Sequence, residues 1–143
     1  MKTLSKRIFL LAKPFLNIRK NYVHTKISFN YAIKLLKKEK GDKEIVIPAI
    51  ILHDVGWKKV PKKIQFKAFG LKKQYKFTRF HEEEGVKIAE KILRKMNYNK
   101  EKINEILKII EKHDTRKKAI SFNDKLVKDA DKLGRYSKTY QIL

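Results

Sequence analysis

The chain has 143 residues, long enough for a substantial hydrophobic core, and we predict a single domain over residues 1–143. It contains no cysteine, which excludes disulfides, thiolate metal sites and cysteine nucleophiles. The net charge of +22 indicates phosphate-bearing partners, but a lysine-rich, thermophile-like composition explains it equally well. The apolar run at residues 8–12 is short and lacks a cleavage site, so we expect a cytoplasmic protein without signal peptide or membrane span.

The chain reads as helical throughout, because apolar residues recur at spacings of three and four and no segment convincingly alternates with period two. We therefore predict an all-α, single-domain bundle of about six helices. They are expected at residues 3–12, at 21–38, at 45–54, from 81 onward, after Asn99, and after Ser121 or Asn123. Pro14 should disturb the end of the first helix, and Pro48 should move the start of the third to Ile47.

The four histidines all fall at or next to a helix end, on the side expected to face inward. His24 and His81 each lie on an apolar stripe with helical spacing, and His113 ends another. In the second helix this stripe is expected at positions 24, 27, 31 and 35. A single buried histidine is more often a core residue than a ligand, but four in such positions favour metal binding.

The stretch from Ile50 to Trp57 places His53 and Asp54 side by side at the end of a buried segment, with Gly56 as a helix stop. Burying both is costly unless something pairs with both, and Mn, Fe, Ni, Zn or Mg would do so. Consecutive helical residues diverge by about 100°, so the two can share a metal only if the helix ends there. The alternative is a helix-capping His53 beside a solvated Asp54.

A long basic loop is predicted between the third and fourth helices, from Trp57 to Phe80. It holds nine Lys or Arg and no acid, and Pro61 and Gly70 interrupt it. Its lysines are interleaved with aromatic residues, which suits phosphate contact and base stacking on nucleic acid. It is an equally good interpretation that the aromatics pack the loop down while the lysines are solvated. The aromatic residues concerned are Trp57, Phe66, Phe69, Tyr75 and Phe77.

The order of these motifs resembles the HD-domain superfamily of metal-dependent phosphohydrolases, an all-helical family. The matching segments, spread over roughly residues 20–135, are NYVHTKISFNYAIKLL, ILHDVGW, HEEEGVKIAEKIL, IIEKHD and KDADKLG. The resemblance implies a first metal held by His24, His53, Asp54 and Asp131. The family's Ala-Asp motif selects Asp131, which leaves Asp129 as a salt-bridge partner or alternative ligand.

The resemblance also implies that His81 and His113 bind a second metal, with Asp54 bridging, so one or two divalent ions are expected. With a single ion, these two histidines would bind phosphate or move protons. The implied activity is cleavage of a nucleotide or related phosphate ester by metal-activated water, with His53 and Asp54 as the central catalytic pair. Trp57 departs from the family, which often has Lys at this position.

Candidate phosphate-binding residues are Lys58, Lys59, Lys132 and Arg135, which lie close to the motifs in sequence. Asp114 or one glutamate of the Glu-Glu-Glu run is a candidate base. A first alternative is a basic nucleic-acid-binding protein that retains the metal site, and a second is a di-iron oxygenase. The substrate, the metal and the oligomeric state stay open, and the short C-terminal end is compatible with a homodimer.

Overall fold

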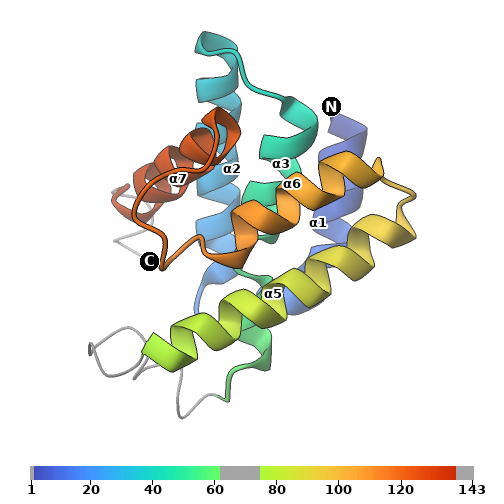
Figure 1. The fold of residues 1–143 in the computed structure, drawn as a ribbon, viewed down its shortest axis with the longest axis vertical. Coiled ribbons are helices and arrows are strands. Elements are labelled where there is room, and N and C mark those ends of the chain that lie inside the picture. The colour runs from blue at the N-terminus through green and yellow to red at the C-terminus, as the bar shows by residue number, and fades with distance from the viewer. Residues whose placement is uncertain (1, 62–74, 138–143) are drawn as a thin grey trace.

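The computed structural model describes residues 2–61 and 75–137. Over these ranges the fold is all-helical, with six α-helices, one 3₁₀-helix and no strand, which confirms the predicted fold class (Figure 1). The elements are α1 (Lys2–Leu16), α2 (Asn21–Lys38), α3 (Lys43–Leu52), η1 (Val55–Lys59), α5 (Tyr75–Lys95), α6 (Lys100–Glu111) and α7 (Phe122–Arg135). None of the helices in the described ranges is both long and apolar enough to cross a bilayer.

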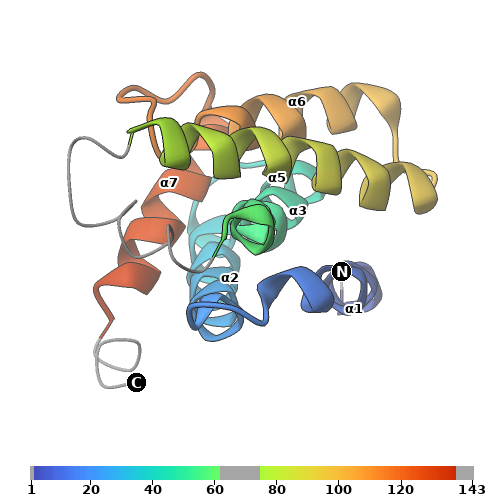
Figure 2. The ribbon, with the colours of Figure 1, turned by 90° about the horizontal axis from the view of Figure 1, so that it is seen from below.

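Helix α3 forms the centre of the bundle. Every side chain from Ile45 to Leu52 is buried, and α1, α2, α6 and α7 all contact this helix. The views in Figures 1 and 2 show α5 and α6 side by side along one side of α3, and α2 and α7 form a second contacting pair. Because other helices surround α3, the residues at its C-terminal end lie in the interior of the protein.

The start of α3 differs from the sequence prediction. The helix begins at Lys43, after an Asp42 N-cap whose side chain accepts a hydrogen bond from the Glu44 N–H. Pro48 therefore lies inside the helix and cannot donate to the Glu44 carbonyl four residues earlier. The Tyr98 hydroxyl donates to this carbonyl instead. This tertiary hydrogen bond replaces the missing helical one, so the predicted start at Ile47 is wrong.

Two other helix limits are also corrected. Helix α1 continues through Pro14 to Leu16, since a proline near the last turn costs only one helical hydrogen bond. Helix α5 begins at Tyr75 rather than at His81. The loop predicted over 57–80 is wrong at both ends, because 57–59 belong to η1 and 75–80 belong to α5; residues 62–74, with Phe66 and Phe69, lie outside the described residues.

Helices α2 and α7 approach one another closely. A Cβ added at Gly134 on α7 would lie 2.2 Å from the Ser28 Oγ and 3.1 Å from the Ser28 Cα on α2. The face of α2 that is buried here includes the small residues Thr25, Ser28 and Ala32, and the predicted stripe at 24, 27, 31 and 35 is buried fully only at His24. The buried residues of α2 are Asn21, His24, Thr25, Ser28, Ala32 and Leu36. This close packing brings His24 near Asp131 of α7.

Candidate metal centre

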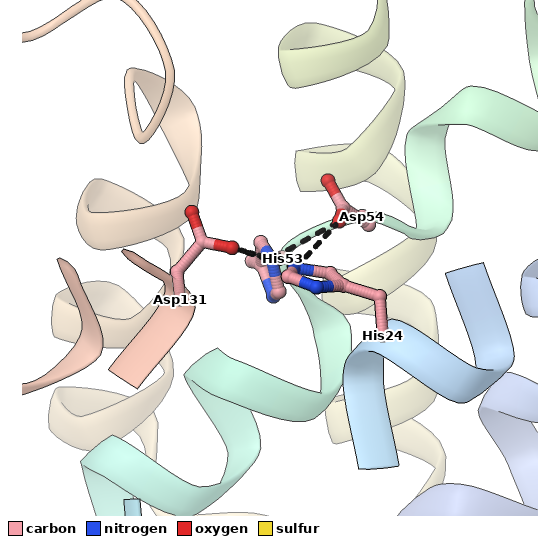
Figure 3. Close-up of side chains that lie close together, drawn as sticks. All are labelled: His24, His53, Asp54 and Asp131. Carbon is pink, nitrogen blue, oxygen red and sulfur yellow. Dashed lines mark hydrogen bonds and ion pairs between the residues drawn. The ribbon is translucent and has the colours of Figure 1, made fainter. Parts of the chain in front are cut away.

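Four of the predicted ligands converge where α2, α3 and α7 meet (Figure 3). The Asp131 Oδ1 lies 2.7 Å from the His24 Nε2 and 3.2 Å from the His53 Nε2. The Asp54 Oδ2 lies 3.1 Å from the His53 Nε2 and 3.8 Å from the His24 Nε2. One potential ligand atom from each residue lies within 4.8 Å of all the others, as a single metal ion requires. We call His24, His53, Asp54 and Asp131 the first cluster.

The local backbone explains how neighbouring residues share this cluster. Helix α3 ends at Leu52, His53 is its C-cap, and Asp54 has left helical geometry with φ −107° and ψ 8°. The helix therefore ends at the His-Asp pair, as the two side chains require if they are to share one metal ion. The His53 Nδ1 donates to the Ile50 carbonyl oxygen at 2.6 Å, which directs its Nε2 toward the carboxylates.

A second cluster is formed by Asp54, His81, His113 and Asp114. The Asp114 Oδ2 lies 3.0 Å from the His81 Nε2 and 3.3 Å from the His113 Nε2. The Asp54 Oδ1 lies 4.0 Å and 3.5 Å from the same two nitrogens. Sequence reasoning considered Asp114 only as a base. The signal for a ligand was present, because His113-Asp114 repeats the His53-Asp54 dipeptide at another helix end.

Asp54 belongs to both clusters. Its Oδ2 faces the histidines of the first cluster, and its Oδ1 faces those of the second. The two oxygens of one carboxylate are thus directed to two neighbouring pairs of histidines. This arrangement can bridge two cations.

Buried hydrogen bonds hold the side chains and backbone of the second cluster. The His113 Nδ1 donates to the Ile110 carbonyl at 2.8 Å, as His53 does to its own helix. Glu82 is fully buried and accepts hydrogen bonds from the Asp114 N–H at 2.7 Å and the Thr115 N–H at 3.0 Å. Arg79 also donates to Glu82, at 2.7 Å. Glu82 therefore fixes the backbone that carries Asp114, a role that periodicity did not reveal.

The electrostatics of the clusters favour bound positive charge. Burial lowers the pKa of His53, but Asp54 and Asp131 outweigh this effect and raise it from 6.5 to about 10. Burial also lowers the pKa of His113, but Asp114 and Asp54 outweigh this effect and raise the pKa well above its usual value. Burial raises the pKa of Asp54 and Asp114, but the histidines lower both pKa values well below the usual range. The carboxylates are thus held ionised.

This donor set fits divalent cations. Three carboxylates and four imidazoles meet in this largely buried site, where a carboxylate without a positive partner would be costly. The His81 Nε2 and the His113 Nε2 lie 3.3 Å apart, so they cannot both point a proton at one another. A metal ion between them would accept both lone pairs, and mixed imidazole and carboxylate ligands suit Mn, Fe, Ni or Zn.

A cavity of about 300 Å³ adjoins both clusters, with Asp131, Asp114, Lys132 and Arg135 among its lining residues. An Arg135 Nη2 lies 3.3 Å from the Asp131 Oδ2 and 3.7 Å from the Asp114 Oδ1. Two of the predicted phosphate-binding residues, Lys132 and Arg135, are thus placed at the cavity.

The remaining candidates lie elsewhere. Lys58 and Lys59 are exposed and do not line the cavity, and Lys58 donates to the Asn17 side chain. Asp129 pairs with Lys125 at 2.9 Å and is in neither cluster. The structure therefore places Asp131, and not Asp129, beside the histidines; helical periodicity had not distinguished the two aspartates.

The HD-domain family model matches residues 21–136, a range that contains every residue of both clusters. Comparisons with curated proteins and with solved structures gave no significant match. Proteins of this family bind divalent metals and are generally phosphohydrolases. The match spans most of the sequence and agrees with the helical fold and the His-Asp clusters, so the chain belongs to the HD-domain superfamily.

Proposed function

We propose that this protein is a phosphohydrolase that uses two divalent metal ions to cleave a nucleotide or a related phosphate ester. The observation that carries the proposal is the position of Asp54, whose two carboxylate oxygens face two different sets of histidines. A single-metal site would need only one of these sets. When bound, the two ions would polarise the phosphoryl group and activate a water molecule for in-line attack.

The side chains divide into holders of the metals and binders of the substrate. The first ion would be held by the first cluster and the second by the second cluster, with Asp54 common to both. The Nδ1 hydrogen bonds of His53 and His113 keep their Nε2 lone pairs directed inward. These bonds pre-organise the site, so little reorganisation is needed when a metal enters.

Arg135 and Lys132 would bind the phosphate. The Arg135 guanidinium lies beside one carboxylate of each cluster, at Asp131 and Asp114. Metal ions would neutralise these carboxylates and weaken their hold on Arg135, which then can donate two parallel hydrogen bonds to a phosphate. Lys132 is exposed at the same cavity and adds a second positive charge.

The proposal is tested by counting metal ions per chain. Chelator-treated protein would be reloaded with Mn²⁺, passed through a desalting column and analysed by mass spectrometry for metals. We expect about two ions in the wild type, since two ligand sets are present, and loss of both in Asp54→Ala. Asp114→Ala should retain one ion. Asp129→Ala is the matched control, because this aspartate pairs only with Lys125 in the described structure, and it should retain two.

The same samples would be assayed for phosphate release from nucleoside mono-, di- and triphosphates, and for hydrolysis of p-nitrophenyl phosphate and its diester. Activity should require added metal and disappear in Asp54→Ala. One ion per wild-type chain would refute the dinuclear site. Folded wild-type protein without metal or turnover would refute the hydrolase.

Nucleic-acid binding is retained as a second candidate because of one specific observation. The chain has no acidic residue before Glu39, so α1 and α2 carry positive charge alone. Trp57 no longer supports base stacking, since its side chain is buried. Oligonucleotide binding that weakens steeply with salt and persists in chelator would favour this function. Absence of binding at low salt would exclude it.

A further inference from the structure

The single tryptophan of the chain lies against a ligand of the second cluster. The Trp57 indole stacks on the His81 imidazole with ring centroids 3.9 Å apart and an interplanar angle of 16°. The Arg19 guanidinium carbon lies 4.3 Å from the centroid of the indole. Trp57 is only 1% exposed, so the stack is enclosed within the protein.

The His81 imidazole is held in place differently from those of the two histidines that follow helices α3 and α6. His53 and His113 each donate from Nδ1 to a backbone carbonyl three residues earlier. The His81 Nδ1 is buried, and no hydrogen-bond partner for it occurs among residues 2–61 and 75–137. The bond that usually fixes the direction of a ligating imidazole is therefore missing at this position.

The backbone around Trp57 is built for close approach to α5. A Cβ at Gly56 would lie 1.7 Å from the His81 carbonyl oxygen and 2.6 Å from the Gly85 nitrogen. The absence of a side chain at Gly56 allows η1 to lie directly on α5. This contact sets the indole parallel to the imidazole of His81.

We propose that Trp57 is a positioning residue that orients His81 toward the second metal ion. The indole face restricts rotation of the imidazole about its side-chain bonds. It thereby keeps the Nε2 directed at Asp114, 3.0 Å away, and at the neighbouring His113. Stacking performs at His81 the task that a hydrogen bond performs at His53 and His113. This inference rests on the proposed dinuclear function.

The test is a titration of chelator-treated protein with Zn²⁺, followed by calorimetry and by tryptophan fluorescence. Zn²⁺ is chosen because it is diamagnetic and does not quench emission by paramagnetism. Trp57→Leu should weaken the second binding step about 10- to 100-fold, as loss of groups that orient ligands usually does, and leave the first step unchanged. Trp57→Phe keeps an aromatic face and should restore most of the affinity.

Leu93→Ala is the matched control for a loss of stability, because Leu93 is a fully buried residue of α5 three turns from His81. It should leave both binding steps unchanged. In the wild type, the second equivalent of Zn²⁺ should alter Trp57 emission, and His81→Ala should abolish this change. The fluorescence result does not depend on how well any Trp57 variant folds.

The outcomes separate the inference from the proposed function. If the wild type binds two ions and Trp57→Leu binds the second equally well, Trp57 does not orient His81. Equal loss in the Leu and Phe variants, or unchanged emission on the second equivalent, would also overturn the inference. A wild type that binds fewer than two ions would instead overturn the dinuclear function on which it rests.

Discussion

The two glycines at the contact between η1 and α5 should respond in opposite ways to the same substitution. An alanine Cβ at Gly56 would overlap backbone atoms, 1.7 Å from the His81 carbonyl oxygen. An alanine Cβ at Gly85 would meet the Gly56 nitrogen at 3.5 Å and an Ile110 methyl at 3.6 Å, which are ordinary contact distances. The pair therefore tests the packing of η1 with a change of one methyl group.

The expected magnitudes follow from these distances. In Gly56→Ala, η1 must move away from α5 by more than about 1 Å, because the obstacle is backbone, and overpacking of this kind costs about 3 kcal/mol. Gly85→Ala places alanine inside a helix, where it is favoured over glycine by about 1 kcal/mol. The two variants should thus differ by about 4 kcal/mol, or roughly 13 °C in melting temperature.

The assay is guanidinium and thermal unfolding of both variants in the presence of chelator, so that metal binding does not contribute. A separate Zn²⁺ titration should show that Gly56→Ala has lost the second binding step, because His81 is displaced, whereas Gly85→Ala has kept it. Equal melting temperatures for the two variants, or a less stable Gly85→Ala, would refute the described contact between η1 and α5.

Three further predictions follow. Asp131→Asn should lose the first ion, because its Oδ1 faces two histidines, whereas Asp129→Asn should lose none, as metal analysis will check. In the presence of chelator, the free energy of unfolding should fall as the pH rises from 6.5 to 10, because His53 binds a proton more tightly in the folded protein than in the unfolded chain. A melting temperature that rises over this pH range would contradict this expectation. Glu82→Gln should destabilise by about 2 kcal/mol in chemical unfolding, and the exposed Glu83→Gln by much less.

Much of the fold followed from the sequence because helical periodicity reports burial. The stripe from His81 through Gly85 and Ile88 is buried as predicted. The placement of α3 failed because a residue far along the chain, Tyr98, supplies the hydrogen bond that Pro48 cannot. Local rules of proline placement contain no information on such a tertiary donor.

The candidate site was predictable to the extent that its ligands stand in recognisable pairs. Both residues of His53-Asp54 were predicted to bind metal, whereas in the equivalent pair His113-Asp114 only the histidine was. The contribution of Glu82 was not predictable, because its partners are backbone N–H groups from a loop 32 residues away. The stacking of Trp57 was missed because its neighbours suggested an exposed basic loop.

The residues of the first cluster are remote in sequence, and this has a consequence for when a metal could bind. His24 and Asp131 are 107 residues apart, and His53 and Asp131 are 78 apart. A zinc finger gathers its ligands from one short segment, whereas here the chain must close its largest loops before a site exists. Nascent or partly folded chains would therefore lack the first cluster. The full binding free energy would be available to stabilise the native state, so that metal supply and protein lifetime become linked.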